Sequence, residues 1–390
     1  MIKKVFNSGE IYNGDVIEVL KTLPDESVDC VVTSPPYFQL RDYGYEGQWG
    51  IESTFNEYLD NLINMMTEVK RILKDTGTVW INLGDSYNSS ANAGDKKFGN
   101  SEFNKNRPSR ELTKTPKKQL QKLPSNTLLM IPQRFAIRCV DELGFALRND
   151  IIWASTNKMP ESVKNRFSKK HEHIFFFVKN KNYYFDLQSI KDNCLPLNRW
   201  GGNKLVAKGN SKWSEQTGQP IYRDRNLQAE DGLKNPGDVS DFWNIPTVPS
   251  KHKHYASFNE KLIFKPIVAG CPSEICTKCG KIVTVTPLTK SVATRPNKSS
   301  KYDDSTDEIY TRSISLKERR VQVQVGETVD RCECNEPTIP GVVLDPFAGS
   351  GTTGVAAIMC NRRYIMIDKS EEYFNLMSER LENAENERLS

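Results

Sequence analysis

The stretch Val342–Gly351, which reads VVLDPFAGSG, decides the fold class of this 390-residue chain. Its apolar start predicts a buried strand that runs into Asp345, and a glycine-rich turn follows. Gly349 and Gly351 let the backbone approach a ligand closely. Residues 352–360 predict a helix directly after the turn. This order is typical of a sheet that binds a ligand at the carboxyl ends of its strands.

The residues after this turn indicate what it can bind. Tyr364–Ile367 reads as the next strand, and Asp368 ends it. A carboxylate in that place can accept hydrogen bonds from both hydroxyls of a ribose. No GKS or GKT follows the glycines, which argues against a phosphate-binding loop. We therefore expect a nucleoside-cofactor site, with a plain tight turn as the alternative.

A second strand-to-loop junction lies in the N-terminal half. The apolar run Val28–Val32 predicts a strand, which stops at Thr33–Tyr37 because two prolines cannot continue a sheet. Apolar residues at helical spacing over 55–73 predict a helix that begins at a capping box and ends before Gly77. Residues 78–83 read as the next strand. Helix followed by strand, repeated, predicts a parallel sheet covered by helices.

The middle of the chain predicts further regular elements and two interruptions. Segment 88–125 carries nine Lys or Arg against three Asp or Glu, and we expect either a solvated loop or an arm that contacts nucleic acid. Segment 187–240 interleaves aromatic and basic residues, which suits base stacking and phosphate contact or a small separate core. Between them we expect a helix over 129–143 and strands over 145–153, 174–178 and 183–186, the last two joined by a hairpin-like connection at 179–182.

Ser34-Pro35-Pro36-Tyr37 forms a rigid loop that suits a planar amine. The prolines hold an extended backbone at the carboxyl end of a strand. Carbonyls and the serine hydroxyl there can accept hydrogen bonds from an exocyclic amine and orient its nitrogen toward an electrophile. Tyr37 can stack on a planar base. The alternative is a proline turn beside a core tyrosine.

Taken together, SPPY at 34–37 and DPFAGSG at 345–351 resemble the paired signature of S-adenosylmethionine-dependent DNA amino-methyltransferases. With SPPY first, the order is similar to the β permutation class of that family, and the resemblance covers most of the chain. It implies an α/β fold with a doubly wound, Rossmann-like core of seven strands, a circularly permuted motif order and DNA-facing insertions. It also implies a cytoplasmic, site-specific modification methylase acting on double-stranded DNA, with a cognate restriction endonuclease as a separate partner.

The resemblance assigns roles only at positions that match the motifs of the family. The target amine, which must leave the duplex by base flipping, would be bound and activated by Ser34, Pro35, Pro36 and Tyr37. S-adenosylmethionine would be held by Asp345, Phe347, Gly349 and Gly351, with Asp368 at its ribose and Phe258 and Lys261 beside its methionine end.

Ser34 is the residue that bears on which atom is modified. Family members with Asp or Asn in its place mostly modify adenine, and those with Ser often modify N4 of cytosine. A hydroxyl can donate or accept beside N3 of cytosine, whereas a carboxylate only accepts. We therefore expect N4 of cytosine ahead of N6 of adenine. Two other hypotheses stay open: an amine methyltransferase acting on RNA, protein or a small molecule, and an inactive core that serves as a zinc-containing DNA-binding module.

Four cysteines predict a structural zinc site. They stand in a CxxCG knuckle and a CxC pair, namely Cys276, Cys279, Cys332 and Cys334. Four thiolates are a common tetrahedral ligand set for zinc. Cys271 is an alternative for one ligand, and residues 281–331 would form a hairpin-like insertion between the two pairs. The other interpretation is an unmetallated insertion whose cysteines remain thiols.

Composition limits the class of protein. Hydrophobic residues make up 37% of the chain and cluster in periodic runs, so the chain is not disordered as a whole. No apolar run is long enough to span a membrane, and the net charge of +5 is compatible with nucleic acid. Nine cysteines, an odd number, indicate a reducing compartment rather than a disulfide framework.

We expect a catalytic half of the core at 1–87, a basic insertion at 88–125, core continuation at 126–186, a target-recognition insertion at 187–240, a core segment near the cofactor at 241–270, a zinc insertion at 271–336 and a cofactor-binding half at 337–390.

Overall fold

The computed structural model divides into two compact units. The core unit comprises Met1–Asp186, Ser240–Ile282 and Glu336–Ser390, and the second unit comprises Leu187–Val239 and Val283–Asn335. The structure describes residues 1–40, 44–88, 123–155, 157–158, 161, 163–190, 239–247, 259–294 and 319–389. Most of the predicted insertions at 88–125 and 187–240 therefore lies outside the described residues.

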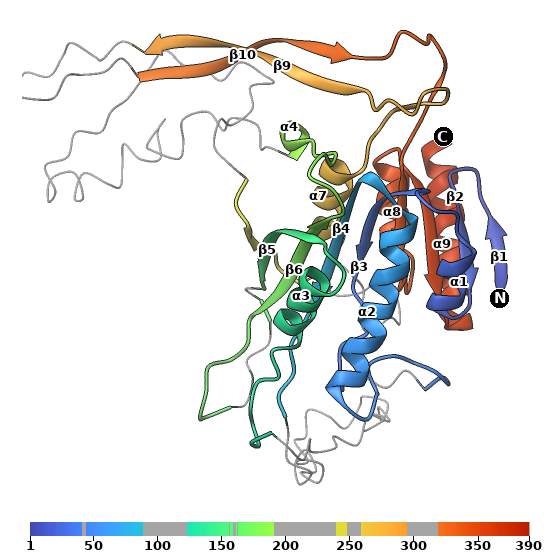
Figure 1. Ribbon diagram of the computed structural model, residues 1–390, viewed down its shortest axis with the longest axis vertical. Helices are drawn as coiled ribbons and strands as arrows, with labels where there is room; N and C mark the ends of the chain where they lie inside the picture. The colour runs from blue at the N-terminus through green and yellow to red at the C-terminus, as the bar shows by residue number, and fades with distance from the viewer. Residues whose placement is uncertain are drawn as a thin grey trace, which may run out of the picture. The chain divides into compact units, whose positions relative to one another are not determined.

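A nine-stranded sheet forms the centre of the core unit, in the order β1-β2-β13-β12-β3-β4-β6-β5-β7 (Figure 1). Neighbouring strands from β2 to β4 in this order pair in parallel, whereas β6 runs antiparallel to both β4 and β5. The strands are β1 (Ile2–Val5), β2 (Gly9–Asn13), β3 (Val28–Thr33), β4 (Leu73–Leu83), β5 (Ala146–Ala154), β6 (His171–Val178), β7 (Phe242–Asn244), β12 (Val342–Asp345) and β13 (Arg363–Asp368).

The sheet is wider than the seven strands that the sequence predicts. At one edge β1 adds antiparallel to β2, and at the other edge β7 adds parallel to β5. Both additions are short, at 4 and 3 residues. Such short strands carry little apolar periodicity. They form because they pair with an existing edge of the sheet, and no local sequence signal predicts them.

Helices cover both faces of the sheet. In β3, Val31 faces one apolar core, while Cys30 and Val32 face the other, because successive side chains of a strand point to opposite faces. The first core is completed by α1 (Val16–Thr22), α2 (Phe55–Ile72) and α3 (Ile131–Asp141), and the second by α7 (Glu260–Gly270), α8 (Thr352–Met359) and α9 (Glu371–Leu389). This arrangement confirms an α/β fold built on a largely parallel sheet.

The predicted helix is confirmed, and two local predictions differ from the structure. The helix α2 begins at the capping box of Thr54 and Glu57 and ends before Gly77, but β4 follows it at once, so the strand begins at Leu73 rather than at 78 and contains Gly77. Residues 183–186 form no strand, because their amides bond to other elements: Tyr184 N donates to Thr76 O and Asp186 N to Ala269 O, both at 2.8 Å. A short helix, α4 (Leu187–Ile190), follows them.

The second unit contains a long antiparallel hairpin. It is formed by β9 (Thr284–Thr294) and β10 (Arg319–Asp330), whose register shifts between Gln324 and Gly326. This confirms the hairpin-like insertion predicted for 281–331. In the core unit, β8 (Ile275–Cys276) pairs with β11 (Thr338–Ile339) as a small separate sheet. Among the described helices, none is both long and apolar enough to cross a membrane.

Candidate functional site

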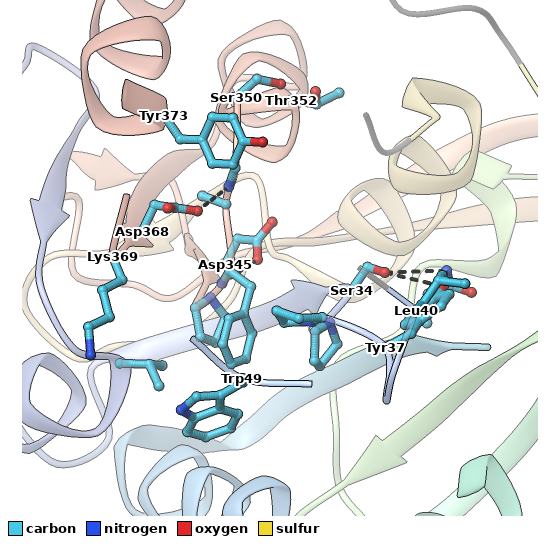
Figure 2. Close-up of a pocket in the computed structure, with 18 of the residues that line it drawn as sticks. Ser34, Tyr37, Leu40, Trp49, Asp345, Ser350, Thr352, Asp368, Lys369 and Tyr373 are labelled. Carbon is cyan, nitrogen blue, oxygen red and sulfur yellow. Dashed lines mark hydrogen bonds between the residues drawn. The ribbon is translucent and has the colours of Figure 1, made fainter. Parts of the chain in front are cut away.

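A cavity of about 460 Å³ opens in the core unit where strands β3, β12 and β13 end. Parallel strands of an α/β sheet bring their carboxyl ends to one edge, so loops far apart in the sequence meet there. Residues of SPPY and of the glycine-rich turn line the same cavity. In Figure 2, Asp345 and Asp368 lie toward one side, and Ser34 and Tyr37 lie toward the other. The volume is in the range of pockets that hold small molecules.

Asp345 fixes the glycine-rich turn from inside. Its Oδ1 accepts a hydrogen bond from Phe347 N at 3.0 Å, and its Oδ2 accepts one from Thr353 Oγ1 at 2.6 Å. Burial raises the pKa of this carboxyl to about 6. The turn needs positive φ at Gly349 (52°) and Gly351 (78°), where a side chain would be strained. The Asp345 carboxylate therefore stabilises the conformation of the turn, and Asp345 also lines the cavity.

Asp368 lies at the end of β13 with its carboxylate at the cavity wall. Its Oδ2 accepts a hydrogen bond from Gly349 N and its Oδ1 accepts one from Ser370 N, both at 2.8 Å. Burial raises its pKa to about 6. Each carboxylate oxygen can accept more than one hydrogen bond, so two hydroxyl donors can still be received. The two acceptor oxygens of Asp368 therefore fit the ribose hydroxyls of a nucleoside cofactor.

An aromatic wall beside these carboxylates consists of Phe347, which the sequence predicts at the cofactor, and Trp49, which it does not. The rings of Trp49 and Phe347 lie 5.1 Å apart at 59°, and both residues line the cavity. Near them, Lys369 Nζ lies 3.5 Å from Asp15 Oδ2. Two aromatic faces suit a flat purine ring. Trp49 comes from a loop that carries no recognisable motif, so only the folded chain reveals it.

The SPPY loop is anchored by neighbouring elements. Tyr58 Oη, on α2, donates to Pro36 O at 2.8 Å, and Leu40 N donates to Tyr37 O at 3.2 Å. Among the described residues, Pro35 O accepts no hydrogen bond, although Pro35 lines the cavity. The loop therefore keeps one backbone acceptor for a ligand.

Tyr37 belongs to a buried polar network at the cavity. Its Oη donates to Glu172 Oε2 at 2.6 Å, and Asn82 Nδ2 donates to the same Oη at 2.6 Å. Ser34 Oγ lies 3.4 Å from Tyr37 Oη (Figure 2). Burial, with the charge of Glu172 as a further cause, raises the pKa of the Tyr37 phenol well above its usual value. Tyr37 is thus a neutral hydrogen-bond donor at ordinary pH.

Gly84 controls the position of this tyrosine. A Cβ at position 84 would lie 2.5 Å from Tyr37 Cε2, closer than two carbon atoms can pack. We expect Gly84→Ala to displace the ring and to lower turnover at least tenfold, while cofactor affinity changes less than twofold. Steady-state methyl transfer and cofactor titration measure the two effects. Unchanged turnover in a folded Gly84→Ala protein would show that the position of the ring does not matter.

The two residues predicted at the methionine end of the cofactor have different outcomes. Phe258 lies outside the described residues. Lys261 lies in the first turn of α7 and is not among the residues that line the cavity. Asn259 caps that helix by accepting from Lys261 N at 3.0 Å, and it does line the cavity. Asn259 is therefore a better candidate than Lys261 on geometry.

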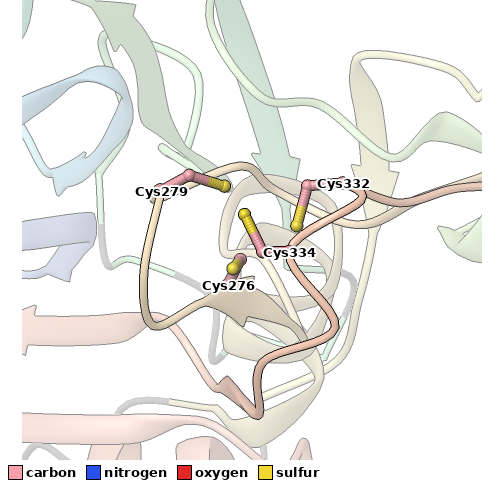
Figure 3. A group of neighbouring side chains, drawn as sticks. All are labelled: Cys276, Cys279, Cys332 and Cys334. Carbon is pink, nitrogen blue, oxygen red and sulfur yellow. The ribbon is translucent and has the colours of Figure 1, made fainter.

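The structure brings the four predicted cysteines together (Figure 3). The sulfur atoms of Cys276, Cys279, Cys332 and Cys334 all lie within 4.8 Å of one another. The first pair sits in a knuckle where Gly280 N donates to Cys276 O at 3.0 Å, and Gly280 has a φ of 70°. Cys271 is fully buried in the core and is not part of the group. The alternative in which Cys271 replaces one ligand is therefore not favoured.

A family model for DNA methylases, both N6 and N4, matches residues 28–277 and 334–379 of the chain. The match includes SPPY, the glycine-rich turn and all residues described above at the cavity from Ser34 onward. It omits both strands of the hairpin of the second unit, β9 and β10.

Two relatives are similar along nearly the whole chain. The type II methyltransferase M.XycI of Xanthomonas campestris pv. cyanopsidis is 30% identical over 97% of this chain and 89% of its own length. The type II methyltransferase M.SmaI of Serratia marcescens is 30% identical over 96% of this chain and 91% of its own length. Among solved structures, the PvuII DNA methyltransferase (cytosine-N4-specific) is 17% identical, with a TM-score of 0.50 over 98% of this chain and 93% of that one. The structural likeness supports the fold.

Proposed function

This chain belongs to the DNA methylase family of S-adenosylmethionine-dependent amino-methyltransferases, and from that premise we propose that it methylates the exocyclic N4 of a cytosine flipped out of double-stranded DNA. The observation that carries the proposal is the single cavity shared by SPPY and Asp368. One end offers acceptors for an amine, and the other offers a carboxylate for a ribose. Positioning of donor and acceptor is the main requirement of this reaction, since bound S-adenosylmethionine supplies an already activated methyl group.

The amine end has two acceptors for the two protons of an exocyclic amine. Ser34 Oγ is one, and Pro35 O is the other. Accepting both protons would turn the nitrogen lone pair out of the base plane and toward the methyl donor. Tyr37 lines the same part of the cavity, where its ring would contact the flipped base and offset part of the cost of flipping.

The cofactor end would hold S-adenosylmethionine through residues of the glycine-rich turn. Asp368 would accept from the ribose hydroxyls, and Asp345 and the two glycines would keep the turn open beside Phe347. Trp49, whose ring lies 5.1 Å from that of Phe347, would add a second aromatic face for the adenine. Asn259 would lie toward the methionine end, where Phe258 and Lys261 were predicted.

Cytosine N4 is preferred over adenine N6 because of Ser34. A hydroxyl can serve as donor or acceptor beside N3 of cytosine, whereas a carboxylate in its place only accepts. Methylation of adenine N6 by the same loop is the alternative. The relatives named type II methyltransferases support a modification methylase paired with a separate restriction endonuclease. The SPPY half, with β3 and β4, precedes the glycine-rich half, with β12 and β13, which supports a circularly permuted order.

DNA contact is assigned to the segments that interrupt the core. The basic segment 88–125 and the aromatic and basic segment 187–240 would bind phosphates and recognise the target sequence. These two roles, like the division of the chain into seven segments, are proposed from the sequence alone.

The cysteine group is proposed to hold one structural zinc. Tetrahedral bonds of about 2.3 Å place sulfurs about 3.8 Å apart, and the four sulfurs lie within 4.8 Å of one another. The knuckle at Cys276 is formed by backbone bonds, since Cys276 N also donates to Lys281 O at 2.9 Å. Residues 271–336 would then be a zinc-binding insertion.

We expect one zinc per chain in protein purified without chelators. Cys276→Ser and Cys332→Ser should each lose the metal because each removes one thiolate of four. Cys360→Ser is the matched control, since Cys360 is partly buried elsewhere and should keep full zinc content. Elemental mass spectrometry measures the ratio. Wild-type protein without zinc, or full occupancy in Cys276→Ser, would contradict the site.

The acceptor class is tested with labelled S-adenosylmethionine. The protein is incubated with plasmid DNA, RNA or protein in separate reactions, and Asp368→Ala serves as the control. Label in DNA alone supports the proposal. Label only in RNA or protein would support the other amine methyltransferases, and absence of label from every acceptor would support an inactive core that only binds DNA.

A further inference from the structure

Resting on the proposed function, we propose that Glu172 is a positioning residue of the methyl-transfer site. It orients the hydroxyls of Tyr37 and Ser34 so that Ser34 accepts from the target amine, and it receives the proton that the methylated amine loses. The resemblance assigned no role to this residue.

The two oxygens of the Glu172 carboxylate have different partners. Oε2 accepts from Tyr37 Oη at 2.6 Å and from Asn82 Nδ2 at 3.2 Å. Oε1 faces Lys158 Nζ at 3.6 Å. The side chain is only 18% exposed, and Glu172, Asn82 and Lys158 all line the cavity. A carboxylate with these partners is a component of the site and not a solvated surface charge.

The carboxylate sets the direction of the whole hydrogen-bond chain. Tyr37 has a single hydroxyl proton, and it uses this proton in the hydrogen bond to Glu172, because a carboxylate can only accept. Tyr37 Oη can therefore only accept from its other neighbours, Asn82 Nδ2 at 2.6 Å and Ser34 Oγ at 3.4 Å. When the Ser34 proton points to Tyr37, one lone pair of Ser34 Oγ faces Asn82 Nδ2 at 3.5 Å and the other is left for the amine. The 3.4 Å distance is longer than a strong hydrogen bond, and such contacts often tighten when substrate binds.

The same chain gives the released proton a path. The amine nitrogen forms a bond to the methyl carbon, and the bond between that carbon and the donor sulfur breaks, with its electron pair staying on sulfur. The nitrogen then carries a positive charge, and its N–H bond breaks. The proton passes to Ser34 Oγ, the Ser34 proton passes to Tyr37 Oη, and the Tyr37 proton passes to Glu172 Oε2, which leaves both hydroxyls neutral.

Three ionisable side chains of the described residues face or interact with this carboxylate. Lys158 faces it directly, Lys169 interacts with it electrostatically, and Tyr37 donates to it.

The test compares Glu172→Gln with wild type, and with Glu142→Gln as a matched control. Glu142 pairs with Arg138 on the surface and lies outside the cavity. Glutamine keeps an oxygen that accepts from Tyr37, but it cannot take up a proton. Four quantities are measured: cofactor affinity, duplex affinity, fluorescence of 2-aminopurine at the target position as a report of base flipping, and the single-turnover rate over pH 5–9 at saturating cofactor.

We expect Glu172→Gln to lower the single-turnover rate about a hundredfold, within the range of general acid–base effects. It should also abolish the rise of rate with pH on the acid side, while both affinities and the fluorescence change stay within twofold. A wild-type rate, an unchanged pH profile, or joint loss of cofactor and duplex binding would each overturn the proposal. Failure of the wild-type protein to methylate DNA would instead refute the proposed function, so the two failures are distinguishable.

Discussion

Tyr37→Ala is expected to lower single-turnover methyl transfer on the order of a hundredfold, with less than a threefold change in duplex affinity. Stacking of a base on an aromatic side chain contributes ~1–3 kcal/mol, and the contact forms only after the base has left the duplex. The substitution also removes the hydroxyl that orders Ser34, so the amine loses a fixed acceptor. Rapid-quench measurement at saturating cofactor, with duplex affinity from fluorescence anisotropy, separates the two quantities.

Tyr37→Phe divides the effect between ring and hydroxyl. It keeps the ring that packs beside Gly84 but cannot donate to Glu172. We expect an intermediate rate, above that of Tyr37→Ala and below wild type. A Tyr37→Ala enzyme that turns over at the wild-type rate would show that Tyr37 has no role in methyl transfer.

Asp368→Ala is expected to weaken cofactor binding about ten- to a hundredfold while duplex affinity changes little. Hydrogen bonds to a charged acceptor contribute about 1.5–3 kcal/mol each, and a ribose offers two donors. The carboxylate also holds Gly349 N and Ser370 N, so its loss loosens the turn as well. Calorimetric titration with cofactor measures the effect, and equal losses of cofactor and duplex affinity would show that the substitution only damages the fold.

The pH dependence of cofactor binding gives an independent check on Asp368. Its pKa is raised to about 6 by burial, so the free protein carries a largely neutral carboxyl below that pH. Hydroxyl donors favour the ionised form, and bound cofactor should therefore lower this pKa. Affinity should rise as pH increases toward 6 and level off above it, with up to a tenfold change per pH unit on the acid side. Asp368→Asn should flatten that dependence, although Asp345, with a pKa also about 6, can leave a smaller residual slope.

Local sequence signals were sufficient to predict the main elements of the site. The glycine-rich turn, the SPPY loop and Asp368 each follow directly from a strand, and strand ends of a parallel sheet converge without further information. The capping box of Thr54 and Glu57 likewise predicted the start of α2. These features depend on residues within a few positions of one another.

Contacts between distant segments explain what the sequence could not predict. Glu172 lies 135 positions after Tyr37, yet their side chains share the 2.6 Å hydrogen bond. Trp49 reaches Phe347 in the same way, from a loop without a motif. Residues 183–186 have an apolar and aromatic pattern typical of a strand, but the backbone donors at 184 and 186 bond to Thr76 and Ala269. At residues 183–186, tertiary partners therefore override the local strand propensity.

Identification of the modified nucleoside tests the proposed methylation of cytosine N4. Plasmid DNA is methylated by the purified protein, digested to nucleosides and separated by mass spectrometry, with a reaction that lacks S-adenosylmethionine as the blank. We expect N4-methylcytosine, absent from the blank. N6-methyladenine without N4-methylcytosine would contradict the assignment of the base while leaving amine methylation of DNA intact, and the absence of both would contradict the proposed activity itself.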